Sequence, residues 1–264
     1  MQHPPSNRLT LLALLLLGIV VLVCGSLGRW QLSRADERRV ISAEIERGRQ
    51  AAPLEILPNM TAESVQPWRS ASAAGEWAGQ FSVLLDNRNL DGRPGLWLAT
   101  PLVLEGGSAV LVVRGWIPRP IGAQLSPKIE TSPSRQMVQG EMSLRVPRLF
   151  ELWTSKKGED SGLPSAWKGI AAPEAGWVDT ATVIRVQNLD LVSLAERTGL
   201  KFLPLVLLQR SPAQDGLVRN WPMPSLDADK NVGYATQWFG FAAIALIAFC
   251  VVLWRFVRHR RRQI

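Results

Sequence analysis

The stretch Leu96–Trp116, LWLATPLVLEGGSAVLVVRGW, decides the fold of the middle of this chain. Two runs rich in β-branched and apolar residues, Leu96–Leu104 and Ala109–Trp116, flank the four residues Glu105–Ser108. Two such runs joined by a short turn that contains glycine are typical of a β-hairpin. The sequence therefore predicts two antiparallel strands connected by EGGS.

Further short strands and one helix are predicted on both sides of this hairpin. Asp190–Thr198 is predicted to be a short helix, because Asp190 suits the N-cap position and Gly199 suits the C-terminal stop. Lys156–Gly176 is rich in Gly, Pro and Ser and is predicted to be a surface loop. The middle of the chain is therefore a mostly β (α+β) domain, for which a barrel is one arrangement that the strands allow. The further strands are Phe81–Asn87, Gln136–Met142, Thr182–Gln187 and Pro204–Arg210.

Working outward, each end of the chain holds a long apolar block without charge, Leu9–Leu27 and Asn231–Trp254. About 20 helical residues cross a hydrocarbon core of about 30 Å, so both blocks are long enough to span a bilayer. We therefore predict an integral membrane protein with transmembrane helices at 9–28 and 236–254 and a domain at 29–235 between them. Its fold class is two terminal transmembrane α-helices flanking a mostly β extracytoplasmic domain.

The first block is predicted to be an anchor that continues as a helix. A cleaved signal peptide has an apolar core of about 7–15 residues and a small-residue cleavage site. Here the core is longer and GRWQLSR follows it, without such a site. Arg29–Gln50 contains no proline and many helix formers, so we expect a helix that prolongs the span.

The net charge of +8 indicates topology. Six of these charges come from arginines at the chain ends, Arg8 and five within 255–264, so only +2 remains for the rest. A basic tail beside a span follows the positive-inside rule, which predicts that residues 1–8 and 255–264 are cytoplasmic and 29–235 is periplasmic. Several arginines after the first span oppose this, but long translocated loops largely escape the rule. Because the excess charge is not on the central domain, no nucleic-acid partner is expected.

The residues available to the central domain exclude most catalytic chemistry. It contains no cysteine and no histidine, which excludes disulfides, Ser-His-Asp or Cys-His nucleophiles, and thiolate or imidazole metal sites. Carboxylate pairs remain at Glu159-Asp160 and at Asp227 with Asp229, and we expect both to be solvated surface groups. We predict that the protein is not an enzyme, with a membrane-tethered carboxylate enzyme as the competing reading.

The tryptophans and two arginines allow a structural role or a binding role. Trp30, Trp238 and Trp254 lie at span ends, where an aromatic belt is expected. Arg88 and Arg114 lie at strand edges, where they suit structural hydrogen bonds or recognition of carboxylates. Core positions are expected for the tryptophans in or beside strands, which are Trp77, Trp97, Trp116 and Trp177.

Four stretches together resemble the Surfeit locus 1 family of cytochrome c oxidase assembly proteins. The first is LGRWQLSRADERR, at Leu27–Arg39. The second runs from LLDNR at Leu84–Arg88 through TPLVLEGGSAVLVVRGWIP at Thr100–Pro118. The third and fourth are LVRNWPMP at Leu217–Pro224 and YATQWFGFA at Tyr234–Ala242. Their order and their position against two terminal spans cover nearly the whole chain.

The resemblance implies a non-catalytic assembly factor for an aa3-type oxidase, which assists delivery or insertion of haem A into the haem–copper subunit. The implied partners are cytochrome c oxidase subunit I, the machinery of haem A synthesis and membrane lipid, and the implied location is a bacterial inner membrane. The alternative is a purely structural scaffold for the oxidase subunit that never binds haem.

The resemblance also implies site residues. Haem A contacts are expected at Tyr234, Gln237 and Trp238. Many members carry a histidine three residues before the tyrosine, where this chain has Asn231, and asparagine is a poor ligand of haem iron. Under this resemblance, Arg88 and Arg114 are also candidates for haem propionates. Partner or structural motif residues are Trp30, Gln31, Arg34, Arg88, Arg114, Gly115, Trp116 and Trp221.

Overall fold

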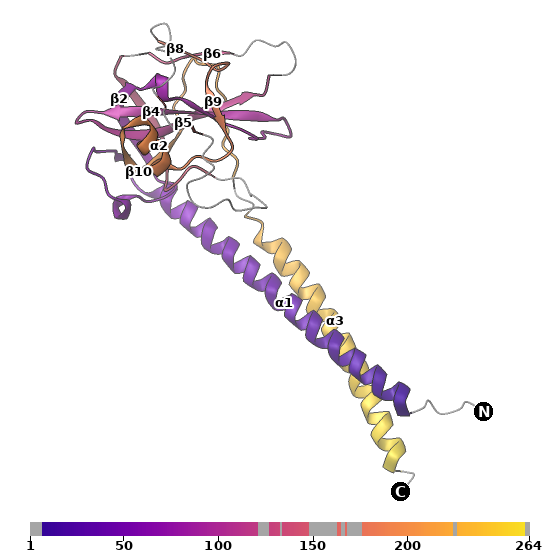
Figure 1. Ribbon diagram of the computed structural model, residues 1–264. Helices are drawn as coiled ribbons and strands as arrows, with labels where there is room; N and C mark the ends of the chain where they lie inside the picture. Colours follow the sequence, from indigo (N-terminus) through magenta and orange to yellow (C-terminus); the bar gives the residue numbers. More distant parts are fainter. Residues whose placement is uncertain are drawn as a thin grey trace. The chain divides into compact units, whose positions relative to one another are not determined.

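The computed structural model describes residues 7–120, 127–132, 134–147, 163–164, 167, 176–223 and 226–261. The chain divides into two compact units: a β unit, Glu44–Met223, and a helical unit formed by the residues on either side of it. The elements of both units are drawn in Figure 1. Most of the predicted loop at 156–176 lies outside the described residues. The predicted membrane boundaries stay predictions.

Two long helices dominate the helical unit, α1 (Asn7–Gln50) and α3 (Ala228–Arg261). The predicted continuation of the first apolar block into a longer helix is confirmed, since α1 runs without a break to Gln50. By length and composition both helices are candidate membrane spans. Their large apolar side chains are widely exposed, for example Leu22 at 72% and Ile244 at 66%. Exposed apolar surface of this extent is typical of a helix in contact with lipid or a partner.

Small residues recur on one face of each helix. On α1 the side chains of Cys24 and Ala35 are buried, and on α3 those of Ala235 and Ala245. A Cβ atom built on Gly28 of α1 would come within 2.8 Å of the Phe239 ring of α3, which places the two helices in contact there. Small residues allow apolar helices to approach closely, as at interfaces within membranes.

The centre of the β unit is a closed five-stranded barrel. Going round it, the strands are β2 (Ser70–Trp77), β7 (Gln136–Ser143), β10 (Lys201–Gln209), β5 (Ser108–Pro118) and β4 (Gly95–Leu104). The ring closes because β2 pairs with β4 as well as with β7. All these pairs are antiparallel except β10 with β5, which is parallel. Closure removes free strand edges and encloses a core.

Every barrel strand contributes to this enclosed core. Fully buried members include Ala73, Leu102, Val112, Met142 and Leu207, one from each strand. Because successive side chains of a strand point to opposite faces, the alternate residues of β5 and β10 lie outside the barrel. There Val113 and Leu208 join a second core with the tryptophans.

The remaining elements extend the barrel. β9 and β3 continue the sheet beyond β4, and β1 pairs with β2 in parallel. β6 and β8 form a separate antiparallel pair. The bounds are β1 (Leu54–Glu55), η1 (Ala62–Ser64), η2 (Gly79–Phe81), β3 (Val83–Leu85), β6 (Lys128–Glu130), β8 (Trp177–Asp179), β9 (Ile184–Val186) and α2 (Leu191–Thr198).

Several local predictions are confirmed. β4 and β5 pair up to Val103 and Ala109, so the EGGS hairpin forms as expected. The side chain of Asp190 accepts a hydrogen bond from the Ser193 amide at 3.2 Å and caps α2. Gly199 ends α2 with a φ of 71°, which glycine adopts without strain.

One strand was not predicted, and one expectation is wrong. β2, with the sequence SASAAGEW, was not predicted because Ala, Ser and Gly have low strand propensity and form no apolar run. The small size of these residues instead suits the crowded barrel: a Cβ on Gly75 would lie 2.3 Å from the Val103 carbonyl oxygen of β4. Trp177 is not a core residue, since it is 46% exposed on the two-stranded sheet opposite Glu130.

Candidate functional site

In the β unit, the LDNR and RGW segments are in contact. The Trp116 indole Nε1 donates a hydrogen bond to the Arg88 carbonyl oxygen at 2.6 Å. The Arg88 guanidinium donates to the Gln187 carbonyl at 2.9 Å and lies 4.8 Å from the Trp97 ring centroid, within cation–π range. A Cβ on Gly95 would lie 2.1 Å from the Trp116 Nε1 atom, so glycine leaves the space that the indole fills.

The described part of the third stretch, residues 217–223, packs against the same region. Val218 and Trp116 exchange two backbone hydrogen bonds, of 2.7 and 2.9 Å. A Cβ on Gly115 would lie 2.6 Å from the Cβ of Leu217, so a side chain there would push the segment away. The Trp221 indole donates to the Gln209 carbonyl at 2.9 Å. Two of the four stretches, the second with its LDNR and RGW segments and the third, therefore form one packed assembly.

Arg114 lies in a separate buried ion cluster. Its guanidinium donates to the Thr131 hydroxyl at 2.8 Å and to the Glu130 carbonyl at 2.6 Å. Its Nη2 atom lies 3.3 Å from an Asp215 carboxylate oxygen, and the same carboxylate pairs with Arg219 at 2.5 Å. Burial lowers the pKa of Arg114 to about 10, which leaves it charged at neutral pH.

The geometry of both arginines supports a structural role. Arg88 is 4% exposed and Arg114 is 3% exposed, and protein acceptors already engage Nη2 of Arg88 and both Nη1 and Nη2 of Arg114. Burial also lowers the pKa of Arg88 to about 10. A carboxylate in solution would have to displace existing partners to reach either group. The hydrogen bonds of these terminal nitrogens support a structural role, and the Nε atom of each arginine has no partner among the described residues.

In the helical unit, the first stretch makes one polar contact with Asn231, three residues before the fourth stretch. The Asn231 side-chain Nδ2 of α3 donates a hydrogen bond to the Gln31 Oε1 of α1 at 2.6 Å. The Asn231 Oδ1 is buried without a partner among the described residues. Residue 231 therefore serves as a helix–helix contact.

The predicted carboxylate pair lies beside this contact. The Arg38 guanidinium of α1 donates to the Asp227 carbonyl at 2.8 Å. The Asp227 carboxylate accepts from the Lys230 amide at 3.3 Å and pairs with its ammonium at 2.8 Å, and these contacts with Lys230 lower the pKa of Asp227. Asp227 thus caps α3. The other predicted pair, Glu159 and Asp160, lies outside the described residues.

Aromatic side chains are exposed at the same end of α3. Tyr234 and Phe241 are each 54% exposed, and Trp238 packs edge-to-face on Phe241 with centroids 6.0 Å apart. Gln237 is exposed beside them. Residues three and four apart share a helix face, so these side chains form one aromatic surface. We call Tyr234, Trp238 and Phe241 the aromatic patch.

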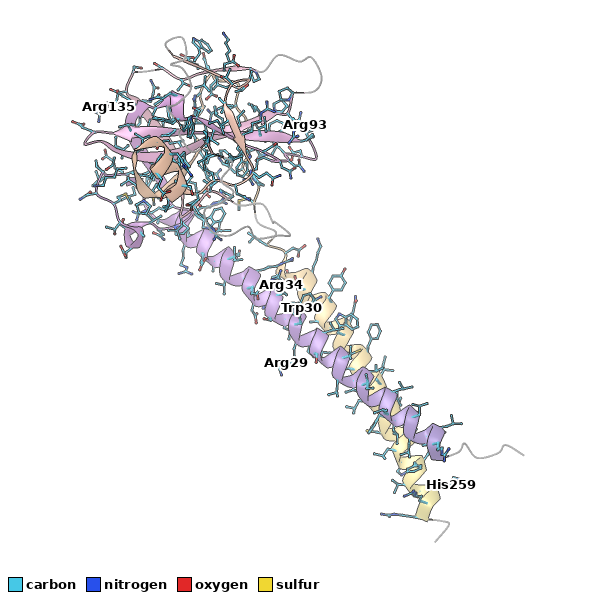
Figure 2. All side chains as sticks on the ribbon, viewed as in Figure 1. Arg29, Trp30, Arg34, Arg93, Arg135 and His259 are labelled. Atoms are coloured by element: carbon cyan, nitrogen blue, oxygen red, sulfur yellow. The ribbon has the colours of Figure 1, made fainter. Side chains whose placement is uncertain are left out.

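The remaining predicted residues lie on α1, where Figure 2 labels them. Trp30 is 56% exposed, and Arg34 forms an exposed ion pair with Glu37 of the same helix at 2.7 Å. The structure thus brings Gln31 to α3 and leaves Trp30 and Arg34 on the outer surface of α1.

Few side chains among the described residues are suited to binding a metal ion. Among the described residues, no group of three or more His, Cys, Asp or Glu side chains is placed to hold an ion. Cys24 and Cys250 are free thiols within the two long helices. His259 lies in the last turn of α3 (Figure 2).

Sequence reasoning missed two buried carboxylates. Asp215 links Arg114 to Arg219, and the Glu141 carboxylate, 5% exposed, lies 2.7 Å from Arg210 and 3.6 Å from Arg49. Asp215 stands four residues before Arg219, a spacing that surface segments also show. No local sequence pattern predicts that Asp215 or Glu141 is buried, because their burial depends on the packing of strands distant in sequence.

Comparisons with known proteins identify the family of this chain. The model of the SURF1 family matches residues 18–243, a range that includes all the motif residues described above. Uncharacterised SURF1-like proteins of Mycobacterium bovis and Mycobacterium tuberculosis are 23% identical to this chain over 256 residues. The match covers 96% of this chain and 86% of each relative.

Proposed function

Since the chain belongs to the SURF1 family, known as cytochrome oxidase assembly factors, we propose that it helps haem A reach the haem–copper subunit of an aa3-type cytochrome c oxidase. The family is generally one of assembly factors and not of enzymes. The observation that carries the proposal is the family match over 18–243, within which Gln31 of the first motif stretch contacts Asn231, three residues before the fourth.

The proposed setting is a bacterial inner membrane. Both long helices are apolar and long enough to span it, and Arg255, Arg258, Arg260 and Arg261 follow the apolar part of α3. The positive-inside rule favours a cytoplasmic position for this basic end, which brings both termini to the cytoplasm and the β unit to the periplasm. Alkaline phosphatase is active only in the periplasm. A fusion to the β unit should therefore be active, and a fusion to the C-terminus should be inactive.

Haem A would be cargo for this protein. Two modes of binding it can be compared: axial ligation of the iron by residue 231, and packing of the macrocycle on the aromatic patch. Axial ligation by residue 231 does not fit, because asparagine is a poor iron ligand and its amide is hydrogen-bonded to Gln31. The aromatic patch fits an apolar macrocycle by packing, since Tyr234 and Phe241 are half exposed. On this proposal the patch binds and orients the cargo at the end of α3 nearest the β unit in sequence.

A second function is favoured by the same contact. If residue 231 serves to hold α1 against α3, the chain can act as a scaffold for subunit I that never binds haem. The Gln31–Asn231 hydrogen bond of 2.6 Å supports this candidate. Both candidates have the oxidase subunit as partner.

Haem content separates the two candidates. The full chain, co-expressed with the enzymes of haem A synthesis and purified in detergent, is assayed by pyridine haemochrome. Haem A near one per chain that falls in a Tyr234→Ala, Trp238→Ala variant supports cargo binding at the patch. A haem-free protein whose Asn231→His variant gains haem supports the scaffold, with the family's haem position at 231. If deletion of the gene leaves the aa3 oxidase at its normal level, both candidates are wrong.

A further inference from the structure

One mouth of the barrel holds a pocket that the proposed function does not use. It has a volume of about 210 Å³. Trp77, Arg114 and Gln209 line it, from β2, β5 and β10. Arg114 and Gln209 each stand two residues after a member of the enclosed core, Val112 and Leu207, so their side chains continue the interior face of their strands. The mouths of β-barrels are recurrent ligand sites.

The charges around the pocket balance. Arg114 and Arg219 are both buried against the carboxylate of Asp215, and the exposed Glu130 lies on the rim. Two positive and two negative groups leave no net charge. An added carboxylate would face Asp215 and Glu130, and an added cation would face Arg114. The electrostatics therefore favour a neutral ligand.

Two lining residues keep a buried polar atom without a partner among the described residues. Arg114 has an unpaired donor, its Nε, and Gln209 has an unpaired acceptor, its Oε1. Both side chains are at least nine-tenths buried, at 3% and 5% exposure. Unpaired buried polar groups are unfavourable, so a ligand that presents an acceptor and a donor together would satisfy both.

The Gln209 amide has freedom to meet such a ligand. Its Nε2 makes two long hydrogen bonds to Ser211, of 3.3 Å to the carbonyl and 3.4 Å to the hydroxyl. Bonds of this length hold the amide weakly, so a modest rotation can present Oε1 to the pocket.

The side chains that line the pocket further limit which ligands it can bind. Val138 and Pro212 are apolar lining residues, and Met137 beside them is 63% exposed. The Arg114 guanidinium covers one face of the Trp77 ring at 4.8 Å, which disfavours a sugar that would stack on that face. Gln136 and Ser132 add more donors and acceptors to the lining.

We propose that this barrel mouth is a recognition pocket for a neutral, extended peptide segment of a partner protein. A backbone carbonyl of that segment accepts from Arg114 Nε, and a backbone N–H donates to Gln209 Oε1. The small volume admits about one residue, whose side chain packs against Val138 and Pro212. The inference goes beyond haem A handling and does not depend on it.

The test uses the full chain in detergent, labelled with 5-fluorotryptophan and followed by fluorine NMR. The Trp77 signal is assigned as the one that is missing from the spectrum of the Trp77→Phe variant. The probes are hexapeptides of Gly, Ala, Ser and Asn with acetylated and amidated ends, and sodium acetate and glucose are compared with them. At least one peptide should shift the Trp77 signal to saturation, with a dissociation constant of about 1 mM or tighter.

Matched variants localise the binding. Gln209→Met keeps the size of the side chain but removes the acceptor, and it should weaken the peptide about tenfold. Gln139→Met, on the exposed side of β7, should bind like the parent. Met137→Arg at the exposed rim should also weaken binding, and it tests the pocket even if Gln209→Met does not fold. The proposal is wrong if no peptide shifts the signal at millimolar concentration, if Gln209→Met binds as well as Gln139→Met, or if acetate or glucose saturates the site instead.

Discussion

The family motifs of the β unit and those of the helical unit serve different purposes. In the β unit, Arg88, Arg114 and Trp116 are all less than 5% exposed and bonded to other parts of the fold. In the helical unit, Trp30 and Tyr234 are more than half exposed. A motif residue that is recognisable in sequence can therefore be a structural support or a surface group, and burial distinguishes the two.

This difference predicts different consequences for substitutions. Changes to the buried motifs should lower the free energy of unfolding and thereby the amount of protein. Changes to the exposed patch should leave the β unit stable and affect only the partner or cargo. Urea unfolding of the full chain in detergent, followed by tryptophan fluorescence, measures the first effect.

The largest effect is expected for Asp215→Asn. This substitution leaves Arg114 and Arg219 buried without a counter-charge, so the free energy of unfolding should fall by about 3–5 kcal/mol. Glu105→Gln is the matched control, because it removes the exposed pair with Arg135 and should cost less than about 1 kcal/mol. Equal effects would mean that the Arg114 cluster is not buried as described.

Glycine substitutions compare the two units directly. Gly95→Ala puts a methyl group 2.1 Å from the Trp116 Nε1 atom and should destabilise the β unit by about 1–3 kcal/mol. Gly233→Ala in α3 meets no atom within 4 Å and should be neutral or stabilising, because alanine favours helix. A neutral Gly95→Ala would contradict the packing of LDNR against RGW.

The same substitution, tryptophan to phenylalanine, should give a smaller difference in unfolding free energy between a buried and an exposed position. Trp221→Phe removes the indole hydrogen bond to Gln209 and should cost about 1–2 kcal/mol. Trp177→Phe, at a side chain that is 46% exposed, should change the unfolding free energy by less than about 0.5 kcal/mol. If the two variants are equally stable, the third stretch does not support the β unit.

The smallest energetic effect is expected for the hydrogen bond between α1 and α3. A double-mutant cycle of Gln31→Leu and Asn231→Leu, measured by unfolding in SDS, should give a coupling energy of about 0.6 kcal/mol, as for other hydrogen bonds between apolar helices. A coupling of zero would remove the evidence that residue 231 holds α1 against α3.

The sequence predicted the parts of the fold that depend on local patterns. The two apolar helices, the EGGS hairpin and the caps Asp190 and Gly199 follow from composition and turn chemistry. The sequence allowed a barrel, which the structure confirms, but it did not predict β2, because Ala73 and Gly75 become strand residues only when β4 and β7 pack against them. Nor could it predict the ion cluster around Asp215, which depends on contacts across about 100 residues.

The predicted motif residues all lie within the range matched by the family model, and their roles stay predictions that the structure narrows. In sequence, Arg88 and Arg114 allow either ligand recognition or support. Their hydrogen bonds to Gln187 and Glu130 favour support. Asn231 was recognised as a departure from a family histidine, and only the packing of α1 on α3 gives it a partner.

The most direct test of the central claim is the amount of aa3 oxidase in membranes of a strain that lacks this gene, measured from reduced-minus-oxidised spectra. The strain is complemented with the parent chain or with the Tyr234→Ala, Trp238→Ala variant, each present at an equal level of folded protein. We predict that deletion strongly lowers the haem a signal, that the parent restores it and that the patch variant does not. An unchanged haem a signal in the deletion strain would contradict the role in oxidase assembly, and full restoration by the variant would contradict the role of the patch.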